Sequence, residues 1–226
     1  MDLPSRLEQV RARIAGAAAL AGRLPSEITL VAVTKVFPAA AIRESYKLGV
    51  RDFGENYLQE FEGKYPEVRD LDGARFHLIG HLQSNKAKRA AELFHTIQTV
   101  DTEKLARRLD ASGKPLDVML EVKLSPEEAK AGADPGELPA LIAAVKSCAN
   151  LRLLGLMAMP PWSEDAEQSR PYFRRLRELG QIHSLRQLSM GMSHDLEVAI
   201  EEGATHVRVG TALFGRRKRV GESPGP

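Results

Sequence analysis

Short apolar runs alternate with longer amphipathic stretches along almost the whole chain. The apolar runs are rich in β-branched residues and predict strands at 28–33, 50–53, 75–79, 96–100, 117–122, 151–156, 187–189 and 206–209. The stretches between them repeat apolar residues at helical spacing and predict helices at 39–48, 102–110, 136–148, 166–179 and 195–202. Gly49 and Gly203 follow two of these helices directly, at the position where glycine commonly ends a helix.

The first twenty residues form a pattern of their own. Leu3, Leu7, Val10, Ile14 and Ala18 recur at the spacing of one helix face and predict an amphipathic helix that packs on the domain. Charged residues interrupt the apolar centre that a signal peptide needs, and the acidic ones argue against a transit peptide. No stretch reaches the roughly 20 apolar residues that a bilayer requires, so we expect a cytoplasmic protein without a membrane segment.

The regular alternation of strands and helices favours an α/β fold, the (β/α)₈ TIM barrel, with the N-terminal helix as an addition. An open, doubly wound sheet is the alternative, although near-continuous strand–helix units leave little for an open edge. No Pro- or Ser-rich linker divides the chain, so we expect one domain over residues 1–226 with its core at about 28–215. Residues 125–136 are expected to form a long loop, and residues 216–226 a frayed tail.

Composition excludes several kinds of function. Among 226 residues, 43% are hydrophobic and 27% are charged, as in an average soluble domain. The 32 Lys and Arg residues exceed the 30 Asp and Glu residues by only two, a far smaller excess than phosphate-bound nucleic-acid proteins show, so no nucleic-acid partner is expected. The single cysteine, Cys148, cannot form an internal disulfide, which favours a reducing compartment.

In a TIM barrel, chemistry gathers at the C-terminal ends of the strands, while the strand interiors are mostly apolar because they fill the barrel. Lys35 follows the first strand and should begin at the apolar mouth of the barrel. Apolar surroundings favour a neutral, nucleophilic lysine amine, which is suited to imine formation with an aldehyde. An ordinary surface lysine is the equally weighted alternative.

Small and hydroxyl residues follow the last two predicted strands. We expect Ser193 to cap the helix at 195–202 and Gly191 to let the backbone approach a ligand. Gly210 and Thr211 precede another helical start after the eighth strand. Neighbouring helix starts of this kind suit a phosphate, and TIM barrels often bind one after strands seven and eight. Ordinary helix capping is the alternative.

Arg208 lies within the last predicted strand and shares a face with His206 that we expect to point into the barrel. A buried arginine needs a partner, which is either a ligand acceptor or an acidic residue in a structural salt bridge. Asn56 could orient a ligand or cap a helix. His77 and His81 have no acidic third ligand nearby in the pattern, so a metal site is not expected.

Several segments together resemble the pyridoxal phosphate homeostasis proteins, which are single-domain relatives of the alanine racemase N-terminal barrel. The segments follow the family's order over about residues 28–215: VAVTK, FGENYLQE, FHLIGHLQSNK, LGLMAMP, LSMGMSHDLEVAI and VRVGTALFG. Three departures are small. Thr34 stands where serine is commoner, FHLIG replaces WHFIG, and Lys123 stands where many members have asparagine.

The resemblance implies a pyridoxal 5′-phosphate (PLP) cofactor in a barrel of PLP fold type III. It implies that Lys35 forms the internal aldimine and that Arg208 hydrogen-bonds the pyridine nitrogen. Asn56 would approach the side of the ring that carries the phenolic oxygen. The phosphate would be held by Ser193, Gly210, Thr211 and the backbone amide of Met192.

The role implied by the resemblance is to hold and deliver the cofactor, without catalysis. An arginine keeps the pyridine nitrogen unprotonated, which makes the ring a poorer electron sink. Alanine racemases take a second base from a partner subunit near their C-terminal domain, and no residues remain here for such a domain after the eighth strand. We therefore expect a monomeric carrier in intracellular PLP homeostasis that serves apo-enzymes. The alternatives are a weak PLP-dependent amino-acid racemase and a cofactor-free aldolase that uses Lys35.

Overall fold

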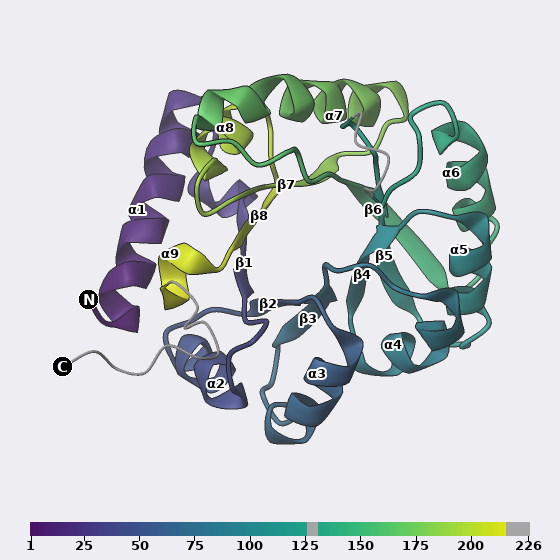
Figure 1. Cartoon of the computed structure of the whole chain (residues 1–226), viewed down its shortest axis with the longest axis horizontal. Coiled ribbons are helices and arrows are strands. Elements are labelled where there is room, and N and C mark those ends of the chain that lie inside the picture. Colours follow the sequence, from purple (N-terminus) through teal and green to yellow (C-terminus); the bar gives the residue numbers. More distant parts are fainter. Residues whose placement is uncertain (126–130, 216–226) are drawn as a thin grey trace.

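Eight parallel strands close into a barrel in the order of the sequence, with β8 pairing back onto β1 (Figure 1). The computed structural model describes residues 1–125 and 131–215. The predicted barrel is confirmed, and the open sheet is wrong because β1 and β8 are hydrogen-bonded neighbours. The strands are β1 (Thr29–Val33), β2 (Asp52–Glu55), β3 (Arg75–Leu78), β4 (Thr96–Val100), β5 (Leu116–Glu121), β6 (Leu151–Met157), β7 (Gln187–Met192) and β8 (His206–Val209).

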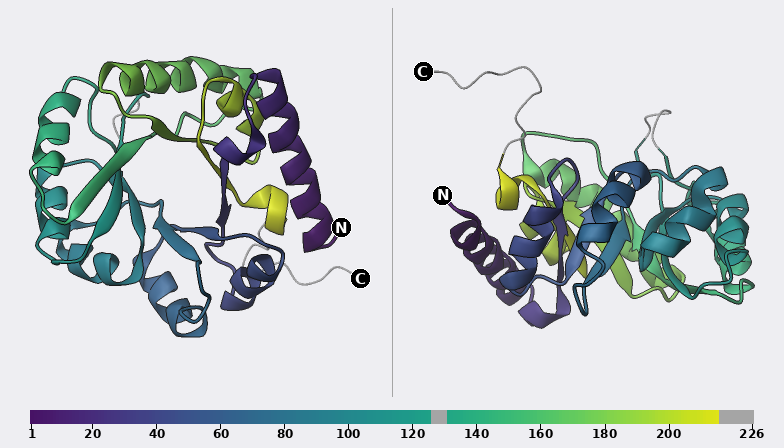
Figure 2. Two further views of the ribbon diagram at one scale, coloured as in Figure 1. Left: turned by 180° about the vertical axis from the view of Figure 1, so that it is seen from behind. Right: turned by 90° about the horizontal axis from the view of Figure 1, so that it is seen from below.

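Helices surround the barrel on its outside (Figures 1 and 2). The α-helices are α1 (Leu3–Leu20), α2 (Ala39–Lys47), α3 (Leu58–Lys64), α4 (Ala87–Leu93), α5 (Glu103–Asp110), α6 (Leu138–Lys146), α7 (Arg170–Ile182), α8 (Leu196–Glu201) and α9 (Thr211–Phe214). Short 3-10 turns lie at Pro25–Glu27, Tyr65–Glu67, Ser84–Lys86 and Ala166–Ser169.

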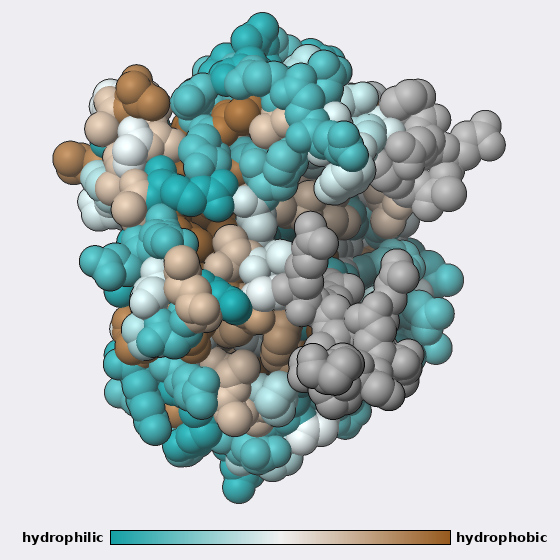
Figure 3. Space-filling model, turned by 60° about the vertical axis from the view of Figure 1, so that its left-hand side comes forward, coloured by the Kyte–Doolittle hydropathy of each residue, from teal (hydrophilic) through white to brown (hydrophobic). Residues whose placement is uncertain are grey.

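The predicted N-terminal helix is present as α1. It begins after Asp2, whose side chain accepts a hydrogen bond from the Ser5 amide. Its buried face packs against α8 and α9, so the first and last helices of the described chain lie side by side. Seen with this side turned forward, the surface is mostly hydrophilic with small apolar areas (Figure 3). No helix within residues 1–125 and 131–215 is long and apolar enough to span a bilayer.

The boundaries of two strands differ from the prediction in a way that affects the pocket. β2 begins two residues later than expected, because α2 is followed by a turn in which Gly49 has a φ of +87°. β7 continues to Met192, so Gly191 belongs to a strand and not to a loop. No ranges were predicted for α3 and α4, whereas α9 begins where a helical start was expected after the eighth strand. The predicted tail at 216–226 and the middle of the predicted loop, 126–130, lie outside the described residues.

The inside of the barrel is more polar than expected. Gln98, Ser189, His77 and Arg208 are each at most 3% exposed. Their side chains bond across the barrel between strands that are not neighbours, such as β4 and β7. The main apolar core instead lies between the strands and the surrounding helices, where Phe53, among others, is fully buried.

Candidate functional site

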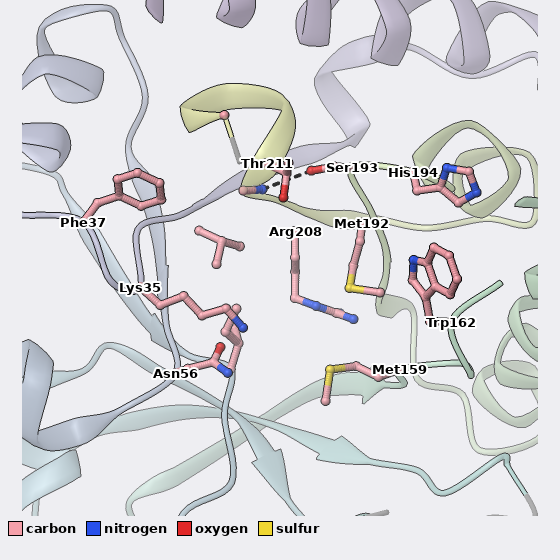
Figure 4. Close-up of a pocket in the computed structure, with 14 residues that line it drawn as sticks. Lys35, Phe37, Asn56, Met159, Trp162, Met192, Ser193, His194, Arg208 and Thr211 are labelled. Carbon is pink, nitrogen blue, oxygen red and sulfur yellow. Dashed lines mark hydrogen bonds between the residues drawn. The ribbon is translucent and has the colours of Figure 1, made fainter. Parts of the chain in front are cut away.

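A cavity of about 240 Å³ opens at the C-terminal ends of the strands (Figure 4). The seven residues predicted to bind the cofactor all line this cavity, whereas Gly191 does not. Apolar side chains, including Val33, Phe37 and Ile79, form part of the wall. The predicted residues that meet here are Lys35, Asn56, Met192, Ser193, Arg208, Gly210 and Thr211.

Ser193 joins the turn after β7 to the turn after β8. Its Oγ accepts hydrogen bonds from the backbone amides of Gly210 (3.3 Å) and Ala212 (3.1 Å). The prediction that Ser193 caps the helix after β7 is wrong, because α8 starts after Asp195 and the Ser193 side chain faces α9. The Met192 amide, expected to bind phosphate, donates to Asp195 Oδ1 at 2.7 Å. Each of these three amides thus donates to an oxygen acceptor that the chain itself supplies.

A residue from α1 fixes the Ser193 turn, and the sequence analysis did not find it. Arg13 Nη2 donates to the Ser193 carbonyl oxygen at 3.0 Å. The same guanidinium makes a two-pronged ion pair with Glu197 of α8. No local signal could have shown this contact, because Arg13 and Ser193 are 180 residues apart.

Gly191 is needed for packing, which differs from the reason predicted. Its φ is +87°, and a Cβ at this position would lie 2.4 Å from Ala199 Cβ. Glycine therefore lets β7 approach α8 closely, just before the Ser193 turn.

Lys35 projects into the pocket from a turn with unusual backbone geometry (Figure 4). The next residue, Val36, has a φ of +64°, which a β-branched side chain rarely adopts. The turn is held because the Val36 amide donates to Glu60 Oε1 at 2.6 Å. On the other side of Lys35, the Thr34 amide donates to the Gly54 carbonyl oxygen at 3.0 Å. The two neighbours of Lys35 are thus hydrogen-bonded to β2 and to α3.

A buried ion pair supports the same turn from inside. Glu55 Oε1 accepts from Thr34 Oγ1 at 2.7 Å and from Lys64 Nζ at 3.0 Å. Lys64 Nζ also donates to the Thr34 carbonyl oxygen at 2.9 Å and pairs with Glu60. Burial raises the pKa of Glu55, and the Lys64 charge opposes that rise. Sequence reasoning missed Lys64 because it did not predict α3.

Arg208 is inward-facing, as predicted, and only 3% exposed. Its Nη1 donates to Ser189 Oγ at 2.7 Å, and its Nη2 donates to the Ala158 carbonyl oxygen at 2.9 Å. Both acceptors are neutral, and within residues 1–125 and 131–215 no salt bridge to Arg208 is formed. Burial lowers the pKa of Arg208 to about 10, which leaves the guanidinium protonated at neutral pH.

The charge of the pocket lining is positive. Lys35 and Arg208 contribute positive charge to the wall, and no carboxylate lines the pocket in the described part of the chain. Such a wall favours an anionic ligand. No cluster of three metal-ligating side chains occurs among the residues that the structure describes.

A second cavity, of about 330 Å³, adjoins the first and shares Met159, Trp162 and Met192 with it. Glu121 lies in its wall, is 4% exposed, and has an Oε2 atom without a hydrogen-bond partner among the described residues. Burial, assisted by the charge of Asp101, raises the pKa of Glu121 to about 7.

The fold and the pocket define a class of protein: a barrel with a lysine just after β1 and with the turns after β7 and β8 joined by Ser193. The chain matches the family model described as alanine racemase, N-terminal domain, over residues 6–218. The pyridoxal phosphate homeostasis protein of Pseudomonas aeruginosa is 50% identical, covering 95% of this chain and 96% of its own. The chain therefore belongs to the family of the pyridoxal phosphate homeostasis proteins.

Solved structures agree with this assignment. PipY of Synechococcus elongatus PCC7942, without PLP, is 41% identical, with a TM-score of 0.84 over 95% of this chain and 100% of its own. The same protein with PLP bound is 43% identical, with a TM-score of 0.78 over 89% of this chain and 100% of its own.

Proposed function

We propose that this protein binds PLP at the mouth of the barrel, holds it covalently through Lys35, and stores and delivers it in the cell without catalysis. The observation that carries the proposal is the meeting of Lys35, Arg208 and the Ser193 turn in one pocket whose described lining has no carboxylate. The name of the Pseudomonas aeruginosa relative and the PLP-bound structure of PipY support the choice of ligand.

Lys35 supplies the reversible bond. Its Nζ attacks the aldehyde carbon of PLP, a C–N bond forms, and the aldehyde oxygen leaves as water. The reverse reaction consumes one water and releases the cofactor. The hydrogen bonds of Thr34 and Val36 fix the backbone of Lys35, so that the amine is presented to the PLP aldehyde from one position.

The phosphate fits the two turns joined by Ser193. A phosphate oxygen can take the place where Ser193 Oγ now accepts from the Gly210 and Ala212 amides. The hydroxyl groups of Ser193 and Thr211 then remain available to donate to the phosphate. Arg13 keeps this turn in place from outside the pocket.

Arg208 and Asn56 face the ring. With a pKa of about 10, the Arg208 guanidinium remains protonated and donates to the pyridine nitrogen, which then carries no proton itself. An unprotonated ring withdraws electrons less effectively, so this contact favours storage over catalysis. Asn56, which lines the same pocket, would donate to the phenolic oxygen.

The rim of the pocket suits exchange. Trp162 is 74% exposed and Met159 is 42% exposed, so the mouth opens to solvent. An open mouth lets PLP leave to an apo-enzyme after hydrolysis of the bond to Lys35. We further propose that the chain is one domain and acts as a monomer in the cytoplasm.

Spectroscopic titration with PLP tests the binding mode. We expect a visible absorption band in the wild type, and its loss in Lys35→Ala, because that band requires the bond between Lys35 and PLP. Lys123→Ala is the matched control, since Lys123 lines the adjoining cavity and not the PLP pocket. A band that survives in Lys35→Ala, or one that disappears in Lys123→Ala, would contradict the proposal.

Two assays test the role after binding. In the presence of a scavenger of free PLP, an apo PLP enzyme should regain activity faster with the loaded protein than with an equal amount of free PLP. Exchange of the α-proton of amino acids in heavy water tests the racemase alternative. Lys35-dependent exchange well above the rate with free PLP would overturn the non-catalytic role.

A further inference from the structure

A continuous line of hydrogen bonds runs through the inside of the barrel, from the PLP pocket toward the opposite opening. Arg208 Nη1 donates to Ser189 Oγ at 2.7 Å, and Ser189 Oγ donates to Gln98 Oε1 at 2.6 Å. Gln98 Nε2 lies 3.1 Å from His77 Nδ1. His77 Nε2 lies 2.9 Å from Asp52 Oδ1. We call these five residues the barrel relay; they lie on β8, β7, β4, β3 and β2.

The donors and acceptors of the barrel relay have a single direction. Arg208 can only donate, so the Ser189 hydroxyl accepts from it and must give its one proton to Gln98. The Gln98 amide group then faces His77 with an N–H, which requires His77 Nδ1 to accept. His77 therefore carries its proton on Nε2 and donates it to Asp52.

Burial makes this pattern rigid. Gln98 and Ser189 are fully buried, and His77 is 2% exposed. If any one of them rotated, its neighbours would be left with unpaired polar atoms out of reach of solvent, which is costly. The orientation of each side chain thus depends on the next one, and the guanidinium of Arg208 is oriented by Ser189, the neutral residue bonded to it.

We propose that Gln98 and His77 are positioning residues for Arg208, which set the direction in which its guanidinium meets the ligand in the pocket. The inference rests on the proposed function in one respect, namely that this ligand is PLP and that Arg208 meets its pyridine nitrogen. The two residues act through Ser189, since neither of them lines the pocket in the described structure.

The far end of the barrel relay supplies its charge. Asp52 and His77 line a separate cavity of about 630 Å³ at the N-terminal ends of the strands. The Asp52 carboxylate, which also lies 3.9 Å from Arg75 Nε, is the charged end of the barrel relay, with three neutral groups between it and the Arg208 guanidinium. Substitution of Asp52 should therefore change the electrostatic environment of the Arg208 guanidinium without altering the residues that line the pocket.

The ring nitrogen itself provides the sharpest test. We compare the affinity for PLP with that for its 1-deaza analogue, in which a C–H replaces the ring nitrogen. Gln98→Met should reduce the preference for PLP by roughly three- to tenfold, the effect of one misdirected hydrogen bond. Equal weakening of both ligands, or no change in the ratio, would overturn the proposal, because a purely structural role cannot distinguish them.

His206→Gln is the matched control. The His206 ring lies in the same lower cavity, with its centroid 6.4 Å from that of His77. Its Nδ1 contacts Thr205 Oγ1 at 2.9 Å, and it makes no hydrogen bond to the barrel relay in the described structure. This variant should keep the wild-type preference for PLP, and a loss equal to that of Gln98→Met would count against the relay.

A second experiment needs no cofactor and preserves the shape of the barrel interior. Asp52→Asn keeps an acceptor for His77 but removes the charge. In the ligand-free protein, the side-chain N–H resonances of Arg208, identified by their loss in Arg208→Lys, should shift in Asp52→Asn while those of Arg13 stay in place. Unchanged Arg208 resonances would refute the relay. Absence of any Lys35-dependent absorption band would instead refute the proposed function and leave this result intact.

Discussion

Removal of the lysine beneath the Lys35 turn should destabilise the protein strongly. In Lys64→Met the Glu55 carboxylate, whose side chain is 0% exposed, keeps only its hydrogen bond from Thr34. Breaking a buried ion pair from one side costs about 3–5 kcal/mol, because the remaining charge is buried without compensation. At about 2–4 °C per kcal/mol for a chain of this length, the melting temperature should fall by roughly 6–20 °C.

The pH dependence of this loss has a definite sign. Burial raises the pKa of Glu55, and Lys64→Met removes the charge that opposes the rise. A raised pKa in the folded state means that the native protein binds more protons than the unfolded chain. Stability then decreases as the pH rises from the unfolded value of about 4.3 through the folded pKa. The cost of Lys64→Met should therefore be greatest near pH 7 and much smaller near pH 4.

Urea unfolding at both pH values measures this prediction. Lys47→Met is the control, because Lys47 also ends its helix but is exposed; its effect should stay within about 0.5 kcal/mol. The double variant Glu55→Gln/Lys64→Met should recover most of the loss, since neither charge remains. A cost below about 1 kcal/mol for Lys64→Met at pH 7, or a double variant no more stable than the single one, would refute the reasoning.

Three further predictions concern other parts of the site. Glu121→Gln should raise the free energy of unfolding over that of the wild type by up to about 3 kcal/mol above pH 7, and by little near pH 4. The reason is that a folded Glu121 pKa of about 7 makes the wild type lose stability as the pH rises between these values. Thermal unfolding at several pH values measures this difference. Gly191→Ala should cost more than about 1 kcal/mol in urea unfolding, because the new Cβ meets Ala199 and the φ is positive. Arg13→Met should lower the free energy of unfolding by only about 1 kcal/mol, because its ion pair is partly exposed. In a competition assay it should nevertheless weaken the affinity for PLP more than that for pyridoxal, which lacks the phosphate that the Ser193 turn is proposed to hold.

The pocket was predictable because strand ends converge in a barrel. Periodicity located every strand to within a few residues, and the rule that chemistry follows the C-terminal ends of the strands then selected Lys35, Asn56 and Arg208. The orientation of Ser193 was not predictable. It depends on how β7 and β8 lie side by side, and a local capping rule considers only the helix that follows in sequence.

The supports of the pocket were missed for the same reason. Arg13 and Ser193 are far apart in sequence, as are Gln98 and Ser189. Each pair meets only after the barrel closes, and neither belongs to a spacing that periodicity can detect. The polar barrel interior was also unexpected, because the sequences of β4 and β7, TIQTV and QLSMGM, do not show which of their polar side chains turn inward.

The bond between Lys35 and PLP is the central claim, and borohydride reduction followed by peptide mass spectrometry tests it most directly. Reduction of the protein incubated with PLP should fix one pyridoxyl phosphate group on the peptide that contains Lys35. The Lys123→Ala variant should give the same modified peptide. An unmodified Lys35 peptide, or equal labelling of several lysines, would contradict the account.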